Sequence, residues 1–296
     1  MLLPVGDQQA ARSGPAEPRT LRIGGLVVPP GSFAIMAVVN RTPDSFYDHG
    51  ATYEFGAALD AASRLVADGA AIVDIGGVKA GDGDEVTVAE EIRRVAGLVA
   101  AVRERHPDIA ISVDTWRAEV GAAVADAGAD LLNDAWGGFD PRLAEVAADR
   151  GLGLVCSHAG GLAPRTTAAS PVYTDVVGEV RGYVTAQAER AVAAGVRPDA
   201  ILIDPAHDFG KNTGHSLELT RRLDALAATG WPVLVAVSNK DFIGDTLALP
   251  VTDRLEGTLA ALAVSAWQGA RVFRVHDVTA ARQALDVVAA FRGGRP

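Results

Sequence analysis

The sequence predicts an α/β protein, folded as a single (β/α)8 barrel with an N-terminal hairpin. Three observations predict this fold. Short runs rich in β-branched residues alternate from residue 33 onward with longer stretches of helical period. The alternation repeats eight times without a linker, and the short runs are apolar throughout, as parallel strands covered by helices are. A chain of 296 residues could form two domains, but a TIM barrel of about 250 residues forms one.

The region before this pattern is predicted to lie outside the barrel wall. Residues 1–20 are polar, contain Pro and Gly, and lack the basic start and apolar middle of a signal peptide. We therefore expect them to form a flexible tail. The segment Leu21–Gly31 predicts a short hairpin that turns at Gly24 and Gly25, and this hairpin could close one end of the barrel. The barrel with its hairpin then occupies residues 21–296.

The barrel strands are predicted where the apolar runs fall. They are Phe33–Asn40, Ala71–Gly77, Ile109–Thr115, Asp130–Asp134, Leu152–His158, Ala200–Pro205, Pro232–Ser238 and Arg271–Asp277. Helical patterns follow them, for example Phe55–Asp68, Val88–Arg105, Arg117–Ala127, Asp175–Ala194 and Arg254–Trp267. A glycine ends several helices, which is typical of a left-handed C-cap; these are Gly69, Gly128, Gly195, Gly230 and Gly269. An open doubly wound sheet is the alternative, but no GxGxxG follows the first strand, so dinucleotide binding is not supported.

The composition limits the classes of partner. The chain has 37 Asp and Glu against 27 Lys and Arg, a net charge of -10, whereas nucleic acid or an anionic membrane would require a basic face. No stretch of about 18 apolar residues predicts a transmembrane helix. The single cysteine, Cys156, excludes an intrachain disulfide and is typical of a reducing compartment. We expect a cytoplasmic protein that binds neither nucleic acid nor membrane, although a local cluster of cations could still hold a small anion.

Polar side chains end almost every predicted strand, at the barrel face where active sites form. Strand ends are often polar because they face solvent, but several of these groups stand two residues inside the strand. Buried polar groups need partners, and a polar ligand is a natural one. The set is Asn40, Asp74, Asp114, Asn133, Asp134, His158, Asp204, Lys240, Arg274, His276 and Asp277.

Four of the six histidines are candidates for a functional role, and they divide into two pairs. His158 and His276 follow apolar strands, which favours a functional role, whereas His207 and His215 flank a loop and are equally compatible with a structural one. HxxxH and HxH spacings and cysteine clusters are missing from the sequence, so we predict no zinc site made of protein ligands alone. Cys156 lies mid-strand and is interpreted as a core residue. For the tryptophans that directly follow strands, packing is more common than ligand contact.

Eight segments, in order along the chain, resemble the dihydropteroate synthase family. They are MAVVNRTPDSF (Met36–Phe46), DIGG (Asp74–Gly77), SVDT (Ser112–Thr115), ND (Asn133–Asp134), IDPxxDFGK (Ile203–Lys211), SNKDFIG (Ser238–Gly244), GTLAA (Gly257–Ala261) and RVHDV (Arg274–Val278). The resemblance extends over about residues 33–290, and eight ordered matches are specific although one alone would be weak. It implies folate-biosynthesis chemistry: a dihydropterin methyl pyrophosphate condenses with p-aminobenzoate and pyrophosphate leaves.

The resemblance implies a pterin site deep in the barrel. Asp114, Asn133 and Asp204 are expected to hydrogen-bond the amino and oxo edge of the pterin ring. Lys240 is expected to donate to the ring oxygen and to N5. Such a set discriminates strongly, because a mismatched ligand leaves a buried polar group unpaired.

The resemblance also implies groups for the pyrophosphate and for catalysis. Arg274, His276 and Asn40 are expected to hold the pyrophosphate, with Mg²⁺ bound by Asn40 and mainly by phosphate oxygens and water. Asp44 is expected to stabilise the cationic pterin methylene, so that Asp44, Lys240 and His276 form the catalytic set. Stabilisation of the leaving group and positioning of the amine would supply most of the catalysis. Two residues are expected near p-aminobenzoate, Phe46 and Ser238, and one more cation, Lys211, is expected near the mouth.

The resemblance breaks in the loop after DIGG. The family usually has ESTRPG there, but this chain has VKAGDG at Val78–Gly83. Ala80 replaces the expected hydroxyl residue and Gly81 replaces the expected arginine, in a loop that helps enclose p-aminobenzoate in the family. Arginine presents a planar fork of donors, which glycine cannot provide. Asp82 adds a negative charge beside an anionic site, and the nearby Lys79 is a point charge with poor geometry.

Two smaller departures from the family pattern also replace an arginine. CSHAGG replaces the usual MHMRG at the fifth strand, and SNK replaces SRK, so arginine is lost at Gly160 or Gly161 and at Asn239. The residues implied in pterin binding are kept, while those serving the second substrate are changed. The sequence therefore predicts a divergent paralogue that still binds a pterin and has weak or lost synthase activity.

Other interpretations stay open. One is an active synthase with a rebuilt loop, and another is a non-catalytic pterin-binding or regulatory partner. A pterin-dependent methyltransferase is disfavoured because Lys240 and RVHD suit a pyrophosphate ligand, and a barrel enzyme for another phosphorylated substrate is the plainest alternative. Broad apolar faces on the helices Gly257–Trp267 and Ala280–Phe291, together with the resemblance, predict a homodimer.

Overall fold

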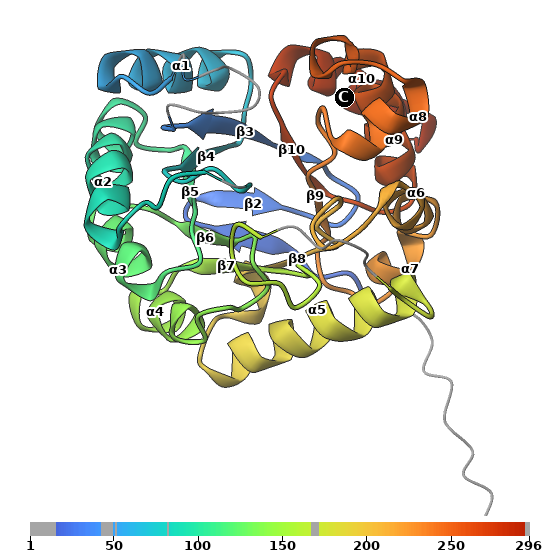
Figure 1. The fold of residues 1–296 in the computed structure, drawn as a ribbon, viewed down its shortest axis with the longest axis horizontal. Helices are drawn as coiled ribbons and strands as arrows, with labels where there is room; N and C mark the ends of the chain where they lie inside the picture. Colours follow the sequence, from blue (N-terminus) through green and yellow to red (C-terminus); the bar gives the residue numbers. More distant parts are fainter. Residues whose placement is uncertain (1–15, 43–49, 51, 82, 167–171, 294–296) are drawn as a thin grey trace, which may run out of the picture.

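Eight parallel strands form a closed barrel that is surrounded by helices, as the sequence predicts (Figure 1). The computed structural model describes residues 16–42, 50, 52–81, 83–166 and 172–293. The strands are β3 (Ala34–Asn40), β4 (Ile72–Gly76), β5 (Ala110–Asp114), β6 (Leu131–Asp134), β7 (Gly153–Ser157), β8 (Ile201–Asp204), β9 (Leu234–Val235) and β10 (Val272–Val275). They pair in the order β8-β7-β6-β5-β4-β3-β10-β9, and a bridge between Ile203 and Val233 closes the ring.

Helices follow the strands and cover the outside of the barrel (Figure 1). They are α1 (Phe55–Ala67), α2 (Val88–Arg105), α3 (Ala118–Asp126), α4 (Arg142–Arg150), α5 (Val176–Ala193), α6 (Thr213–Arg221), α7 (Asp224–Ala227), α8 (Asp241–Leu247), α9 (Leu255–Trp267) and α10 (Val278–Phe291). Short 3-10 turns cover Pro198–Ala200 and Val251–Asp253. The predicted C-cap glycines have the left-handed conformation, for example Gly195 after α5 at φ +108°. Within the described ranges, the chain has no helix long and apolar enough to span a bilayer.

The N-terminal hairpin closes the end of the barrel where the strands begin. This end is called the lower end below. β1 (Leu21–Ile23) and β2 (Leu26–Val28) pair antiparallel around Gly24, whose φ of +54° suits the turn. Leu21, Ile23 and Val28 are buried in one cluster with an inward-facing residue of each barrel strand. Those residues are Met36, Ile72, Ala110, Leu131, Val155, Leu202, Leu234 and Val272. Burying a large aliphatic side chain contributes about 1.5–3 kcal/mol, so the hairpin is an integral part of the lower core.

The chain is attached to the barrel earlier than the sequence predicts. The Ala16 amide donates to the Ala228 carbonyl at 3.1 Å, and the Arg19 amide donates to the Gly230 carbonyl at 3.0 Å. The Arg19 guanidinium also lies 3.8 Å from the Trp231 ring centroid, a favourable cation–π distance. Residues 16–20 of the expected flexible tail therefore include specific contacts with the barrel.

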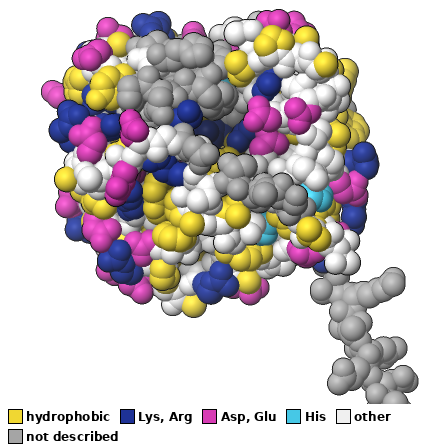
Figure 2. All heavy atoms as spheres, in the orientation of Figure 1, with side chains coloured by type: hydrophobic (Ala, Val, Ile, Leu, Met, Phe, Trp, Pro, Cys, Tyr) yellow, Lys and Arg dark blue, Asp and Glu magenta, His cyan; other side chains and the backbone are white. Residues whose placement is uncertain are grey.

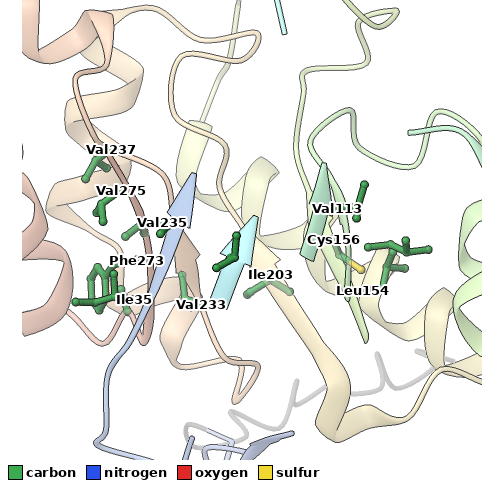
Figure 3. Close-up of a cluster of buried hydrophobic side chains, with 14 of the residues drawn as sticks. Ile35, Val113, Leu154, Cys156, Ile203, Val233, Val235, Val237, Phe273 and Val275 are labelled. Carbon is green, nitrogen blue, oxygen red and sulfur yellow. The ribbon is translucent and has the colours of Figure 1, made fainter. Parts of the chain in front are cut away.

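The larger core lies between the barrel wall and the helices. Figure 3 shows side chains of this layer, among them Ile35, Cys156 and Phe273, which point away from the barrel interior. Cys156 is buried, as predicted for a core residue, and its burial raises the pKa of the thiol far above the ordinary value. The predicted strand Pro232–Ser238 is reduced to β9, Leu234–Val235.

Strand alternation places polar residues directly above the apolar lower layer. Because side chains on one face of a strand recur every second residue, the residue two positions after each lower-layer side chain also faces inward. In β4 this is Asp74, in β6 it is Asn133, and in β10 it is Arg274. The barrel interior thus changes from apolar at the hairpin end to polar at the carboxyl ends of the strands.

Candidate functional site

A cavity of about 260 Å³ opens at the carboxyl ends of the strands. This is slightly below the roughly 300–1,000 Å³ typical of small-molecule sites. The residues that the family resemblance assigns to the pterin, the pyrophosphate, p-aminobenzoate and catalysis all line it where the structure describes them: Asn40, Asp114, Asn133, Asp204, Ser238, Lys240, Arg274 and His276. Two further predicted residues, Asp44 and Phe46, lie outside the described residues. Figure 2 shows basic side chains near the centre of this face.

Asp74 is the centre of a buried hydrogen-bond network below the cavity. Its carboxylate is inaccessible to solvent. Oδ1 accepts from Ser112 Oγ at 2.6 Å, and Oδ2 accepts from Asn133 Nδ2 at 3.1 Å and from Arg274 Nε at 2.6 Å. Because the carboxylate only accepts, the amide nitrogen of Asn133 must face Asp74. The sequence marked Asp74 as a polar strand end, but its role as the common partner of these side chains was not predicted.

Arg274 joins two carboxylates rather than standing alone. Nε donates to Asp74 and Nη2 donates to Asp114 Oδ2 at 3.1 Å. Burial lowers the pKa of Arg274, but the two carboxylates more than offset this and the pKa is raised above its ordinary value. Arg274 is therefore charged at any physiological pH. The residues expected to serve the pyrophosphate and the pterin ring are hydrogen-bonded to each other.

The two carboxyl groups predicted to bind the pterin ring, those of Asp114 and Asp204, have raised pKa values. Burial raises the pKa of Asp114 to about 7, while the charge of Arg274 acts in the opposite direction. Burial also raises the pKa of Asp204 to about 6, and the Ala206 amide, which donates to Asp204 Oδ1 at 2.7 Å, limits the rise. A carboxyl with such a pKa responds to small changes near neutral pH.

Lys240 stands at the N-cap of α8 and its pKa is lowered by burial. Its Nζ lies 4.5 Å from the Phe209 ring centroid. Asp208, in the loop after β8, opposes the pKa shift and caps α8 from outside. Asp208 Oδ2 accepts from the Asp241 amide at 2.8 Å and from the Phe242 amide at 3.4 Å. Asp208 and Phe209 both belong to the DFGK motif, but no local sequence pattern predicted these contacts.

Ser238 and His276 form a pair. The Ser238 hydroxyl and His276 Nδ1 lie 2.9 Å apart, and the His276 amide approaches the same hydroxyl at 3.3 Å. Ser238 lines the cavity, but its hydroxyl orients the imidazole. This orientation leaves Nε2 as the imidazole nitrogen that faces away from Ser238.

The structure does not bring His158 to the cavity, although its place after an apolar strand favoured a functional role. His158 is buried beside Lys211, whose Nζ lies 3.1 Å from His158 Nδ1. Burial, and then the Lys211 charge, lower the pKa of His158 to about 4, so the ring is neutral at pH 7. Its ring packs at 5.0 Å from Tyr183, measured between centroids. His158 does not line the cavity, and it packs between neighbouring loops and α5.

Lys211 is also displaced from its expected place. Its Nζ donates to the carbonyl oxygens of His158 at 2.7 Å and Phe209 at 2.8 Å, and to that of Ala206 at 3.1 Å. Burial lowers its pKa to about 7. These bonds fix two loops to each other, so Lys211 is not a cation directed into the main cavity.

His207 and His215 both make contacts within the segment that follows β8, and His207 also lines the cavity. His207 is fully buried with Nε2 at 3.1 Å from Thr220 Oγ1, and burial lowers its pKa to about 3. His215 forms a capping box with Asn212 at the start of α6. Both histidines therefore stabilise the segment that follows β8.

The described part of the loop that departs from the family pattern, residues 78–81, lines the cavity but carries no guanidinium group. This loop is called the altered loop below. Val78, Lys79, Ala80 and Gly81 all line the cavity. A Cβ at Gly81 would meet only the Lys79 side chain, at 4.0 Å, so the space for a larger side chain is open. Asp82 lies outside the described residues.

An arginine from a different loop reaches this region from outside. Arg165 Nε donates to the Gly81 carbonyl at 3.2 Å, and Nη1 donates to the Asp84 carbonyl at 2.6 Å. Arg165 does not line the main cavity. It fastens the backbone of the altered loop and does not replace the missing arginine as a ligand-binding group.

Aromatic rings pack beneath the altered loop, as expected for the two tryptophans. The Trp116 and Trp136 centroids lie 6.4 Å apart, and the Trp136 and Phe209 centroids lie 5.2 Å apart, both edge to face. Val78 and Leu162 pack against this cluster. Two loops of the mouth thus share a small apolar core.

The fold and the site together define a barrel protein that binds a small polar ligand at the carboxyl ends of its strands. The family model described as "Pterin binding enzyme" matches residues 36–276. The chain belongs to this family of pterin-binding barrels.

Named relatives sharpen this assignment. The chain is 57% identical over 266 residues to "Inactive dihydropteroate synthase 2" of Mycobacterium leprae (strain TN), covering 88% of this chain and 91% of that protein. It is 38% identical over 257 residues to "Dihydropteroate synthase" of Escherichia coli (strain K12), covering 86% and 90%. A solved Yersinia pestis dihydropteroate synthase with a sulfonamide drug has a TM-score of 0.87 and 36% identity, covering 93% and 99%. The prediction of a divergent member of the dihydropteroate synthase family is confirmed.

Proposed function

We propose that this protein binds a dihydropterin methyl pyrophosphate in the barrel mouth and has weak or no dihydropteroate synthase activity. One observation carries the proposal. The buried polar set around Asp74 is complete, while Gly81 faces the same cavity without a side chain. The similarity to a protein named an inactive synthase supports it.

The proposed pterin site uses four side chains. Asp114, Asn133 and Asp204 would bond the amino and oxo edge, and Lys240 would donate to the ring oxygen and N5. Asp74 supports this arrangement because it holds both Asn133 and Arg274 in place. Positions fixed before binding reduce the cost of ordering side chains around a ligand.

The proposed pyrophosphate site uses Arg274, His276 and Asn40. Two of the guanidinium nitrogens of Arg274 bind Asp74 and Asp114, so Nη1 is the nitrogen we assign to a phosphate oxygen. Within the described residues, no group of three or more His, Cys, Asp or Glu could hold a metal. Mg²⁺ takes oxygen ligands and usually arrives with phosphates. One amide oxygen at Asn40 therefore fits a Mg²⁺ held mainly by pyrophosphate, where it would offset the charge of the leaving group.

The proposed weakness of the condensation comes from the residues that would hold p-aminobenzoate, the second substrate. Catalysis would require Asp44, Lys240 and His276, with p-aminobenzoate near Phe46 and Ser238. Amine attack depends on positioning, and a carboxylate is positioned best by a bidentate arginine. Ala80 and Gly81 provide no such group, so the amine would not be held for attack.

We also propose a homodimer through α9 and α10. Large apolar side chains are exposed there: Val264, Trp267, Val287 and Phe291. Trp267 is 58% exposed and Phe291 is 75% exposed, and exposed apolar side chains on two neighbouring helices favour an interface. Light scattering should give the mass of two chains, and Trp267→Asp should give one. The buried, free Cys156 supports a cytoplasmic, reducing location.

Calorimetry with site variants tests the proposed pterin site. Wild-type protein should bind the dihydropterin methyl pyrophosphate, and Asp114→Ala and Lys240→Ala should each weaken binding at least tenfold. Asp149→Ala, an exposed position on α4, is the control and should bind as the wild type does. Equal affinities for all four proteins would contradict the proposed site.

A further inference from the structure

A second cavity of about 320 Å³ adjoins the main cavity, in which the pterin site is proposed, on the outer side of the mouth. The main cavity is called the pterin cavity below, and the second cavity is called the outer cavity. Gly81, Phe209 and Lys240 line both cavities. A ligand in the outer cavity would therefore lie beside a pterin bound at Lys240.

The walls of the outer cavity suit a flat aromatic ring. Trp136 and Phe209 both line it, with ring planes at 76° to each other. Trp136 is buried in the aromatic cluster of the mouth, so its ring is held in place before a ligand binds. Aromatic ligands gain from edge-to-face and offset contacts with such rings.

The charges around the outer cavity do not suit an anion. Among the described lining residues, the charged groups are Asp208, Asp241, Lys211 and Lys240. Lys211 is buried and donates to three carbonyl oxygens. Lys240 lies over the Phe209 ring, at the boundary with the pterin cavity. Burial lowers the pKa of both lysines.

The nearest arginines bind protein groups instead of facing the outer cavity. Arg165 donates to the carbonyls of Gly81 and Asp84. Arg254 Nη1 donates to the Asn239 carbonyl at 2.9 Å and to Asp241 Oδ1 at 2.9 Å. Neither arginine is among the described lining residues of the outer cavity.

We propose that the outer cavity binds an uncharged aromatic compound in preference to an aminobenzoate. This inference rests on the proposed pterin site and adds the chemical class of the second ligand. A carboxylate here would lose water without gaining a bidentate cation, which is costly. It would also face Asp208, whose carboxylate is held in place by the α8 amides. An uncharged amide of the same shape meets neither penalty.

Paired titrations with 4-aminobenzamide and 4-aminobenzoate test the preference. Each compound is titrated into the protein alone and into protein saturated with hydroxymethyl dihydropterin and pyrophosphate, which cannot condense. The amide should bind at least about tenfold more tightly, which corresponds to about 1.4 kcal/mol. Asp208→Asn should strengthen 4-aminobenzoate binding severalfold and leave the affinity for 4-aminobenzamide nearly unchanged. The side-chain oxygen of the asparagine can still accept from the backbone amides of α8, so the loop should keep its structure. Asp149→Asn, on exposed α4, should change neither affinity.

The outcomes separate the two proposals. If the pterin does not bind but the amide is still preferred, the proposed function fails and the inference on the outer cavity holds. If the pterin binds and 4-aminobenzoate binds as tightly as the amide, the inference is overturned and the proposed function stands. Binding of neither compound, with or without the pterin, also overturns it.

Discussion

Arg274 donates from Nε to Oδ2 of the fully buried Asp74 at 2.6 Å, across a separation of 200 residues in the chain. This ion pair links β10 to β4 through the interior of the barrel. It fixes the floor of the proposed pterin site, because Asp74 also binds Ser112 and Asn133. The pair therefore connects the stability of the barrel to the shape of its cavity.

Asp74→Ala should destabilise the protein strongly. Removing one partner of a buried pair leaves an uncompensated charge, here Arg274, and typically costs about 3–5 kcal/mol. Urea denaturation measures the free energy of unfolding. The matched control is Asp60→Ala, which breaks an exposed pair with Arg105 and should cost less than about 1 kcal/mol. Equal losses in the two variants would show that the buried network does not support the barrel.

The pH dependence of stability should reveal the raised pKa of Asp114. Its pKa is about 7 in the folded protein, against about 3.9 in an unfolded chain. Between these values the native state binds more protons than the unfolded state, so this contribution to stability declines as pH rises from about 4 to about 7. The stability of the wild type minus that of Asp114→Asn should therefore fall across this window and become constant above it. A difference that does not vary with pH would contradict the raised pKa.

Restoring the loop should restore condensation. Gly81 has open space for a Cβ and does not have a positive φ, so the double change Ala80→Thr and Gly81→Arg fits the backbone. We expect p-aminobenzoate-dependent pyrophosphate release to rise at least about tenfold, equivalent to about 1.4 kcal/mol in the barrier. Gly25→Arg, in the hairpin turn with equally open space, is the control. No increase, in a double variant that still binds the pterin, would show that other departures abolish the reaction.

Removal of Mg²⁺ should affect only the pyrophosphate part of the ligand. With EDTA present, the affinity for the dihydropterin methyl pyrophosphate should fall severalfold, because the phosphates lose the ion that offsets their charge. Hydroxymethyl dihydropterin, which carries no phosphate, should bind equally with and without EDTA. Equal weakening of both ligands would place the metal in the pterin site and contradict the assignment to Asn40.

Strand alternation explains which site residues the sequence could predict. Asp74, Asn133 and Arg274 stand two residues after apolar inward positions, and the structure places all three in the interior. His276 follows Arg274 by two positions and lines the cavity. His158 follows the inward-facing Ser157 by one position, so it lies on the opposite face. The period of two could have excluded it, but the prediction relied only on its place at a strand end.

Contacts between loops could not be predicted in this way. Asp208 caps α8 and Arg165 fastens the loop at Gly81, and each contact joins segments that are distant in sequence. Hydrophobic period and turn residues describe only local structure. The eight barrel strands and the hairpin were predictable because burial repeats along each element, whereas the mouth depends on how separate loops meet.

A calorimetric titration of the dihydropterin methyl pyrophosphate in the presence of Mg²⁺ and p-aminobenzoate tests whether the protein binds the pterin without condensing it, because it records binding and turnover together. We predict a saturable binding isotherm with little or no sustained reaction heat. Sustained heat at the rate of an active synthase, or no binding isotherm at all, would contradict it.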